Sequence, residues 1–275
     1  MSLDIGPIGF GGMPLSIQGR PSEEEGRRVI QAVIDAGIDF IDTADVYCLD
    51  DNDIGHNERL IASVVPPNFK VGTKAGLRRP RGAWTRDASP KHIRDACERS
   101  LRALNVDQIW LYQLHAPDPK AGFEKSVETF AELQREGKCK LVGLSNVSID
   151  EIERAKKIVD VQSVQNRLNP YFRESLDVAQ WCGENDITFL AYSPVGGGRL
   201  AKKIPKFEVL QEIASKHECS PHAVVLAWVR SKAKTVVPIP AARTVEHALD
   251  SANSARVQLS NEELAAIDVE YFDVG

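Results

Sequence analysis

The sequence predicts one α/β domain over residues 1–275, a (β/α)8 TIM barrel in which eight parallel strands alternate with helices. Short apolar segments and capped amphipathic segments alternate along the chain, and no repeat, low-complexity tract or long linker interrupts them. The length of 275 residues suits one such barrel. The rival fold is a doubly wound open sheet. It would need the glycine fingerprint G-x-G-x-x-G after the first strand, and Pro14 occupies the last of those positions.

The first half of the chain is expected to supply four strands. An apolar segment at 8–10 precedes a helix that the capping box of Ser22 and Glu25 opens. Gly37 ends that helix, because glycine tolerates the left-handed backbone found there, and a buried strand follows at 38–42. The remaining elements of this half are a short helix at 58–64, a strand at 69–74, a helix opened by Ser89 and Pro90, and a strand at 108–114.

The second half is expected to supply the other four strands, at 140–144, 161–165, 187–191 and 235–239. A helix from about residue 123 ends at Gly137, before the first of these strands. The capping boxes at 148–151 and 260–263 open a helix after the fifth strand and a C-terminal helix. Further helices are expected at 174–185, at 207–216, from Ser220 and Pro221, and from Thr244.

Charge and hydropathy restrict the partners of the chain. The net charge is −5 and no block of basic residues is present, so nucleic acid is not an expected partner. No apolar run reaches the length of a membrane span, and the N-terminus lacks the features of a signal peptide. We therefore expect neither nucleic acid nor a membrane as a partner, and we also expect a cytoplasmic monomer.

The cysteines indicate a reducing compartment. There are five, an odd number, and none forms a C-x-x-C pair. We expect reduced thiols, with no disulfide framework and no metal site. Cys48 lies next to Tyr47, where it is either a reactive thiol or a small packing residue.

Ionisable residues mark the ends of three consecutive predicted strands. Asp42 ends the second strand, Lys74 ends the third, and His115 follows the fourth, while Tyr47 lies five residues after Asp42. Singly, each has an ordinary explanation: a helix-capping carboxylate, a rim lysine, a satisfied histidine or a partly buried phenol. In a barrel, however, neighbouring strand ends lie about 4.8 Å apart at the mouth that carries the active site. We therefore expect the four side chains to converge there.

These four residue types suit proton transfer at a carbonyl or an alcohol. A free tyrosine has a pKa near 10, and the Lys74 cation would lower the pKa of Tyr47 toward neutrality. Asp42 would hold Lys74 charged and in place, and His115 would orient a substrate oxygen. None of the four can donate a hydride, so a redox cofactor must supply it.

The motifs around these residues resemble the aldo-keto reductase family over essentially the whole chain. They are FIDTADVY, GHNE, VGTK, SLRALNVDQIWLYQLH, GKCKLVGLSN, AYSP and VPIP, in this order. The resemblance implies a catalytic tetrad of Asp42, Tyr47, Lys74 and His115, with tyrosine as the general acid. It also implies reduction of an aldehyde or ketone by a nicotinamide cofactor, NADP(H), with NAD(H) as the alternative.

The same resemblance implies where the cofactor binds. Ser145, Asn146 and Gln165 match the side chains that hold the nicotinamide amide, and Tyr192 matches the aromatic residue that stacks on the nicotinamide ring. The residues that match the loop beside the pyrophosphate are Ser193, Pro194, Val195, Gly196 and Gly198. The residues that match the adenosine phosphate end are Arg243, Thr244 and His247.

Three features depart from the family pattern or vary within it. Few residues precede the first strand, so we expect a thinly covered barrel floor. Ala241 and His247 stand where many members carry lysine and arginine, which leaves the choice between NADP(H) and NAD(H) open. The variable loop at 77–87 is expected to cover the substrate with Trp84. Its four arginines either favour polar or anionic substrates or form a solvated basic loop.

Three other functions stay open on the sequence alone. A reductase of pyridoxal belongs to the same reaction class. A cofactor-binding regulatory subunit with little turnover would also keep the tetrad. A lyase would instead use Lys74 to form a Schiff base with its substrate.

Overall fold

The computed structural model describes residues 2–274, which contain an eight-stranded parallel sheet whose strands follow the order of the chain. The strands are β1 (Phe10–Gly11), β2 (Phe40–Asp42), β3 (Lys70–Ala75), β6 (Ile109–Leu114), β7 (Cys139–Ser145), β8 (Val161–Arg167), β9 (Thr188–Tyr192) and β10 (Val236–Pro238). Most residues of these strands are buried, as expected for parallel strands that have packed side chains on both faces.

Backbone hydrogen bonds between the two ends of the chain close the sheet into a barrel. β1 pairs with β2 on one side. On its other side, the Gly9 amide donates to the Pro238 carbonyl at 3.0 Å, and the Gly11 amide donates to the Pro240 carbonyl at 2.8 Å. The predicted parallel β/α barrel is therefore confirmed.

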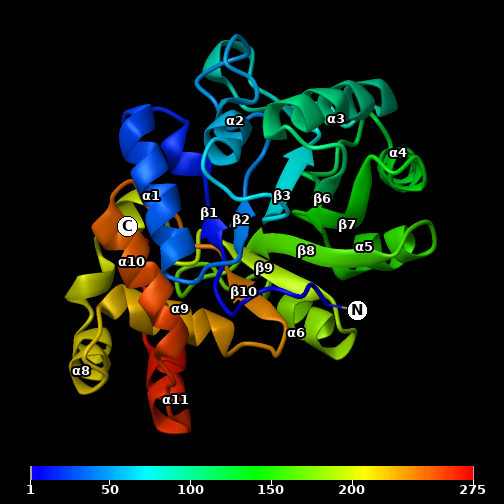
Figure 1. The fold of residues 1–275 in the computed structure, drawn as a ribbon. Helices are drawn as coiled ribbons and strands as arrows, with labels where there is room; N and C mark the ends of the chain where they lie inside the picture. The colour runs from blue at the N-terminus through cyan, green and yellow to red at the C-terminus, as the bar shows by residue number, and fades with distance from the viewer. Residues whose placement is uncertain (1, 275) are drawn as a thin grey trace.

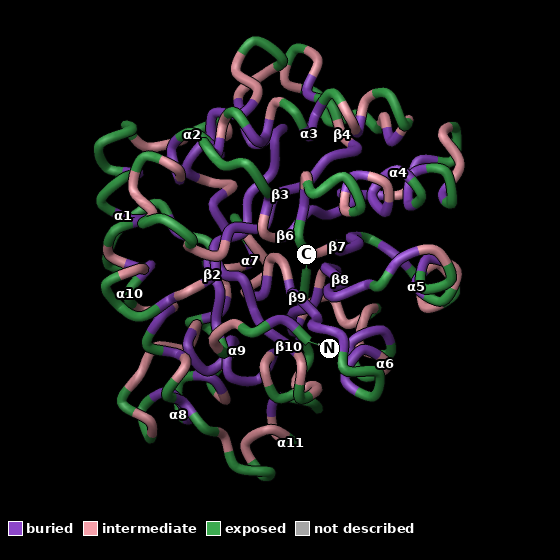
Figure 2. The backbone as a smooth tube through the Cα atoms, turned by 45° about the vertical axis from the view of Figure 1, so that its right-hand side comes forward, coloured by how far each residue is buried: buried purple, intermediate pink, exposed green. Residues whose placement is uncertain are grey.

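Helices surround the strands, as Figure 1 shows. They are α1 (Glu23–Asp35), α2 (His56–Ala62), α3 (Pro90–Leu104), α4 (Phe123–Arg135), α5 (Ile149–Lys156), α6 (Leu176–Glu184), α7 (Gly198–Ala201), α8 (Glu208–Lys216), α9 (Pro221–Arg230), α10 (Val245–Asn253) and α11 (Asn261–Val269). In Figure 2 the strands are mostly buried, and exposed residues concentrate on the outer faces of the helices. Within residues 2–274, no helix is long and apolar enough to cross a membrane.

Serine caps determine where several helices begin. Ser22, Ser148 and Ser260 each form a capping box with the glutamate three residues later. Ser89 and Ser220 each accept a hydrogen bond from the third amide of their helix, and proline occupies the first helical position of both. These helix starts agree with the sequence prediction.

Apart from short 3-10 turns, two features were not predicted, and most predicted boundaries differ by one or two residues. The first is an antiparallel hairpin of β4 (Leu77–Arg78) and β5 (Thr85–Arg86), which folds within the loop after β3. The second is α7, in the segment after β9. Strands of two residues are too short to show a twofold alternation of apolar side chains, so no sequence pattern marks the hairpin.

Residues 3–6 cover the floor of the barrel, which corrects the expectation of a thin cover. The Leu3 amide donates to Thr188 Oγ1 at 2.7 Å, and the Gly6 amide donates to Asp39 Oδ1 at 2.8 Å. Thr188 begins β9 and Asp39 immediately precedes β2, so both anchors lie at the amino ends of strands. Leu3 is buried in one cluster with the strand residues Phe40, Leu111, Leu190 and Val237 and with Ile239, which directly follows β10.

Candidate active site

Three neighbouring strands bring the predicted catalytic residues to one mouth of the barrel. Asp42 ends β2, Lys74 is the last residue but one of β3, and His115 directly follows β6. β2 pairs with β3, and β3 pairs with β6, so the three strand ends are adjacent. Tyr47 lies in the loop between β2 and α2.

Hydrogen bonds connect Asp42, Lys74 and Tyr47. Lys74 Nζ donates to Asp42 Oδ2 at 2.6 Å and to the Thr43 carbonyl at 2.8 Å, and it lies 3.1 Å from the Tyr47 hydroxyl oxygen. Lys74 is fully buried, and Asp42 and Tyr47 are buried as well. Lys74 is therefore a fixed, ion-paired cation beside the phenol. This arrangement argues against a lyase, because a Schiff-base lysine must present a free amine to its substrate.

Two buried glutamines bind the other oxygen of the Asp42 carboxylate. Gln165 Nε2 donates to Asp42 Oδ1 at 2.8 Å, and Gln113 Nε2 donates to the same oxygen at 3.2 Å. Gln165 Nε2 also lies 3.3 Å from Gln113 Oε1, so the two amides orient each other. Gln113 was not among the predicted site residues. The available signal was an amide in an otherwise apolar strand, because a buried glutamine requires hydrogen-bond partners.

Burial dominates the protonation of Tyr47. It raises the pKa of the phenol above its usual value, and the nearby Lys74 cation opposes this rise without cancelling it. The expectation that the pKa falls toward neutrality is therefore wrong for the protein by itself. Burial also acts to lower the pKa of Lys74, but Asp42 and Tyr47 outweigh it, and the pKa is raised. The site thus holds a neutral phenol beside a charged ammonium.

His115 faces the Tyr47 ring as a neutral imidazole. The two ring centroids lie 5.7 Å apart with an interplanar angle of 83°. Burial, and then the Lys74 cation, hold the pKa of His115 well below its usual value. Its Nδ1 is buried and has no hydrogen-bond partner among residues 2–274. A neutral imidazole offers one donor and one acceptor, which suits the orientation of a substrate oxygen.

The residues predicted to hold the nicotinamide lie around the same mouth. Ser145 ends β7 and is in register with Gln165 of β8, and both are buried. Asn146 has a left-handed backbone with φ of 59°. Its Nδ2 donates to the His115 carbonyl at 2.9 Å, and its Oδ1 accepts from the Tyr192 hydroxyl at 2.9 Å. The structure therefore brings these four predicted residues together beside the tetrad.

The predicted pyrophosphate loop directly follows β9. Ser193 has φ of 47°, and Gly196, Gly197 and Gly198 have φ of 82°, 67° and 43°. A Cβ added at Gly198 would meet no atom within 4 Å, so this part of the backbone faces open space. A loop with several left-handed residues can turn successive N–H groups to one side, which is the chemistry that binds phosphate oxygens.

Arg243, Thr244 and His247 form a separate group at the start of α10. Figure 1 shows α10 beside α1, on the opposite side of the barrel from β7. Thr244 caps α10, because its Oγ1 accepts a hydrogen bond of 3.3 Å from the His247 amide. The Arg243 guanidinium donates to the carbonyls of Gln18 at 3.1 Å and Pro14 at 3.3 Å. A ligand that reaches both this group and the nicotinamide residues must be extended, as a dinucleotide is.

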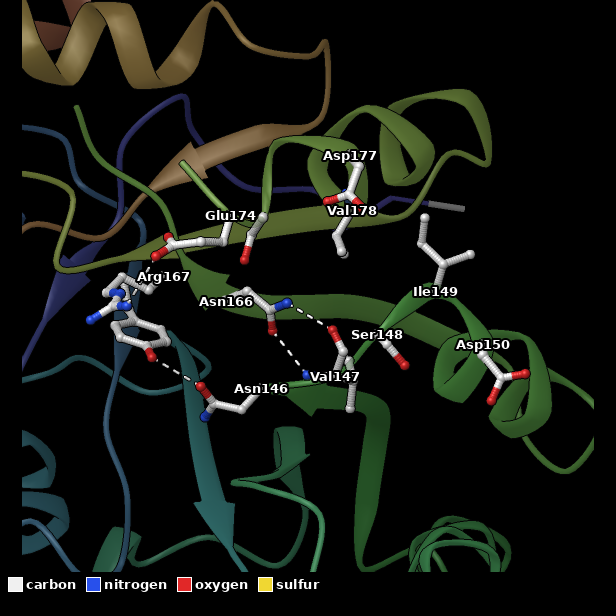
Figure 3. A pocket seen from close by; sticks show the side chains of 12 residues that line it. Asn146, Val147, Ser148, Ile149, Asp150, Asn166, Arg167, Glu174, Asp177 and Val178 are labelled. Carbon is white, nitrogen blue, oxygen red and sulfur yellow. Dashed lines mark hydrogen bonds and ion pairs between the residues drawn. The ribbon is translucent and has the colours of Figure 1, made fainter. Parts of the chain in front are cut away.

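A cleft of about 680 Å³ opens beside Asn146 and Tyr192. Figure 3 shows Asn166 with its amide turned to the Val147 backbone, to which it is joined by two hydrogen bonds of 2.8 and 3.1 Å. The remaining lining residues are Ser148, Ile149, Asp150, Arg167, Glu174, Ser175, Asp177 and Val178. The cleft therefore lies between the loops that follow β7 and β8, next to the predicted nicotinamide residues.

The β4–β5 hairpin places Trp84 against Tyr47. The ring centroids lie 6.4 Å apart with an interplanar angle of 79°, and Trp84 is 46% exposed. Three of the four arginines in this loop are exposed, but Arg79 is buried, with 2% of its surface accessible. The expectation that the arginines of this loop are solvated is therefore wrong for Arg79.

The cysteine side chains are free thiols. Burial is the main cause that raises the pKa of the Cys48 thiol to about 12, so Cys48 has the character of a packing residue and not of a reactive thiolate. Over the described part of the chain, no group of three or more His, Cys, Asp and Glu residues could hold a metal ion.

A parallel barrel with a phenol, an ion-paired lysine and a neutral imidazole at its carboxyl mouth has the architecture of a barrel oxidoreductase. A sequence model of the aldo/keto reductase family matches residues 7–270, and the chain belongs to this family. It is a nicotinamide-dependent oxidoreductase.

Similar proteins agree with this membership over most of their length. An uncharacterized oxidoreductase of Schizosaccharomyces pombe is 31% identical over 273 residues, which cover 97% of this chain and 87% of that protein. The structure of the glycerol dehydrogenase from Gluconobacter oxydans has a TM-score of 0.84 at 25% identity, with 97% and 92% of the two chains covered. An aldo/keto reductase from Klebsiella pneumoniae, in complex with NADP and acetate, has a TM-score of 0.82 at 25% identity, with 96% and 90% covered.

Proposed function

We propose that this protein reduces aldehydes or ketones to alcohols with NADPH, and that Tyr47 is the general acid. The observation that carries this proposal is the buried contact of 3.1 Å between the Tyr47 hydroxyl and Lys74 Nζ. Asp42 fixes the same ammonium at 2.6 Å. A fixed cation at this distance stabilises the negative charge that develops on the phenol oxygen as its proton leaves.

The residues of the proposed tetrad would supply the proton and orient the substrate. His115 orients the carbonyl oxygen with a hydrogen bond near the Tyr47 hydroxyl. Tyr47 donates its proton to this oxygen, and Lys74 stabilises the phenolate that remains. Asp42, held by two buried glutamines, keeps Lys74 charged. When bound, the nicotinamide cofactor supplies the hydride for the carbonyl carbon.

Three sets of residues fit the three parts of the cofactor. The polar side chains at the ends of β7 and β8 offer the donors and acceptors that a nicotinamide amide needs, and Tyr192 would pack beside the ring. The backbone of residues 193–198 suits the pyrophosphate. Arg243 and the amino end of α10, which Thr244 caps, suit the 2′-phosphate of NADP(H). The similar enzyme from Klebsiella pneumoniae was crystallised with NADP.

Trp84 would form an apolar wall of the substrate site, because its ring lies against Tyr47 and remains partly exposed.

We also propose that the enzyme is a cytoplasmic monomer. Five unpaired thiols suit a reducing compartment.

Replacing Tyr47 with phenylalanine tests the proposal. Tyr47→Phe removes the proton donor and keeps the ring, so reduction of a panel of aldehydes, followed by loss of NADPH absorbance, should fall by at least about a hundredfold. NADPH affinity should be unchanged. Tyr271→Phe is a matched control, because Tyr271 is 80% exposed.

Two outcomes would contradict the proposal. If Tyr47→Phe keeps more than about a tenth of wild-type turnover, Tyr47 is not the general acid. If the wild type binds NADPH but reduces no member of a panel that includes pyridoxal, the proposed carbonyl reduction is refuted and the alternative of a cofactor-binding regulatory subunit with little turnover is favoured.

A further inference from the structure

Arg79 differs from the other arginines of the β4–β5 hairpin because its side chain is buried. It is 2% exposed, whereas Arg78, Arg81 and Arg86 are exposed. A buried guanidinium is costly unless its N–H groups are hydrogen-bonded. The partners of Arg79 therefore indicate why it occupies this position.

The Arg79 guanidinium joins three segments of the chain. Its Nε donates to the Cys48 carbonyl at 3.3 Å, in the loop between β2 and α2. Its Nη2 donates to Gln18 Oε1 at 2.8 Å, in the segment between β1 and α1. Its Nη1 donates to the Gly82 carbonyl, within the turn of the hairpin itself. A rigid planar fork can satisfy three such acceptors together, whereas a lysine ammonium presents a single point of charge.

The face of the same guanidinium lies on the ring of Trp84. Arg79 Cζ is 3.8 Å from the indole centroid, and the indole meets the Tyr47 ring edge to face. Trp84 is 46% exposed, so burial by itself does not fix the orientation of its ring. The stacked guanidinium supplies a second surface that fixes it.

Gln18, the partner of Arg79 between β1 and α1, makes further hydrogen bonds that fix its position. Gln18 Nε2 donates to the Leu49 carbonyl at 3.1 Å. On the other side, Arg243 Nη2 donates to the Gln18 carbonyl at 3.1 Å. The hairpin is thus tied to two loops of the barrel mouth through one buried side chain.

We propose that Arg79 is a positioning residue of the substrate site, which holds the hairpin in place, fixes Trp84 against Tyr47 and thereby sets the preference for aromatic carbonyl substrates. The inference rests on the proposed carbonyl reduction. Arg79 acts through Trp84 and touches none of the reacting groups. Its loss should therefore change the recognition of aromatic substrates and leave proton transfer intact.

Fluorine NMR tests the contact without any turnover. With 5-fluorotryptophan incorporated, the four tryptophans give separate signals, and Trp84→Phe identifies the signal of Trp84. In Arg79→Met this signal should shift and narrow, as for an exposed indole that rotates freely. In Arg86→Met, the matched exposed arginine of the same hairpin, it should not change. An unchanged Trp84 signal in Arg79→Met overturns the inference.

Steady-state kinetics test the consequence for substrate choice. Arg79→Met should raise KM for an aromatic aldehyde on the order of fivefold, the effect of losing one aromatic contact. Its kcat, and its KM for a short aliphatic aldehyde, should stay near wild type. In a Trp84→Ala background the substitution should add nothing to KM, because both changes remove the same contact. Equal effects on both aldehydes, or additive effects of the two substitutions, reject the inference in favour of a general structural role.

Gln18→Leu provides a second variant in case Arg79→Met does not fold. It removes one partner of Arg79 from an exposed position and should change both readouts in the same direction by a smaller amount. The two arms also separate two failures. A wild type that reduces no carbonyl refutes the proposed function, and the substrate role of Arg79 with it. If the wild type reduces carbonyls but the Trp84 signal is unchanged in both Arg79→Met and Gln18→Leu, only the inference about Arg79 is refuted.

Discussion

As the proposed general acid, Tyr47 must keep its proton until a carbonyl is in place, and its surroundings favour this. Burial raises the pKa of the phenol, while the Lys74 ammonium favours the phenolate. The neutral form therefore predominates in the protein by itself, and the proton is available for reduction. How readily this proton leaves depends on Lys74.

Lys74→Met should lower turnover by on the order of a hundredfold or more. It should also move the rise of kcat with pH in alcohol oxidation to higher pH. Oxidation needs the phenolate as the base, and removal of the cation raises the pKa of Tyr47 further. The fold should survive, because methionine matches the lysine side chain as far as Cε and two glutamines still bind Asp42. The measurement is kcat against pH with an alcohol and NADP⁺.

The control for this variant is Lys91→Met, at an exposed lysine of α3 that pairs with Asp95. If kcat for oxidation rises at the same pH in Lys74→Met and in the wild type, with proton transfer rate-limiting, the coupling is contradicted. Asp42→Asn should act in the same direction more weakly. The substitution loosens Lys74, which raises the pKa of Tyr47. It also removes the negative charge of Asp42, which lowers the pKa of Tyr47 and partly offsets the first effect.

Arg243→Ala should weaken NADPH binding by roughly 1.5 kcal/mol and leave NADH binding nearly unchanged. This value is the lower end of the range for a hydrogen bond to a charged group, because Arg243 is exposed to solvent. Two of its donors already bind the carbonyls of Pro14 and Gln18. Titration of both cofactors by quenching of tryptophan fluorescence measures the effect. Arg256→Ala, at another exposed arginine, is the control.

Two results would change the assignment of Arg243. Equal weakening of NADPH and NADH would place Arg243 at the part that the two cofactors share. Tighter binding of NADH than of NADPH by the wild type would refute the preference for NADP(H).

The residues of the proposed tetrad could be predicted to converge because Asp42, Lys74 and His115 lie at or next to the end of an apolar strand, where a barrel gathers side chains, and Tyr47 lies in the loop that follows the first of these strands. Gln113 could not be assigned to the site in this way, because it lies inside a strand and its function depends on facing Asp42. Arg79 was also missed. An arginine in a basic, glycine-containing loop has no local signal for burial, and its three acceptors come from segments that only the folded chain brings together.

At the scale of the element, the capping boxes should contribute measurably to stability. Ser22→Ala should lower the free energy of unfolding by about 1 kcal/mol. The substitution removes the Ser22 hydroxyl, which accepts a hydrogen bond from the Glu25 amide at the start of α1. Urea denaturation measures the change, and Ser22→Thr should largely restore stability because threonine also caps helices. Equal losses for alanine and threonine would show that the cap is not the cause.

Long, capped helices and strands bounded by glycine were predictable because their signals are local. The β4–β5 hairpin was not, because only two backbone pairs define it and contacts with other loops stabilise it. The boundary of β10 shows a related limit. β10 ends at Pro238, although the Ile239 amide still donates to the Ala191 carbonyl of β9 at 3.0 Å, so the apolar pattern does not mark the last residue of the strand.

At the scale of the whole molecule, Asp45 makes stability depend on pH. Asp45 is fully buried, and neither of its carboxylate oxygens has a hydrogen-bond partner within residues 2–274. Arg99 Nη2 lies 3.7 Å away. Burial first, and the nearby Glu58 second, raise the pKa of Asp45 well above its usual value. A carboxyl with a raised pKa in the folded state stabilises the fold below the unfolded pKa of about 3.9, and this contribution is lost as pH rises toward the folded pKa.

Asp45→Asn should therefore stabilise the protein increasingly as pH rises above about 4. At pH 8 the midpoint of thermal unfolding should rise by roughly 3 °C, the shift that about 1 kcal/mol produces in a chain of this size. Calorimetry of both proteins across this pH range measures it, with Asp107→Asn as an exposed control. A difference in midpoint that does not vary with pH would contradict this account.

The hydrogen bonds that join β1 to Pro238 and Pro240 also constrain when the barrel can form. Synthesis proceeds from the N-terminus, so the residues of β1 leave the ribosome long before their partners Pro238 and Pro240. Until then one edge of β1 stays unpaired, and Leu3 has no completed core to cover. Contacts between such distant parts of a chain slow folding. A chain whose translation stalls before residue 238 would therefore present an open strand edge, which invites pairing with other nascent chains or capture by a chaperone.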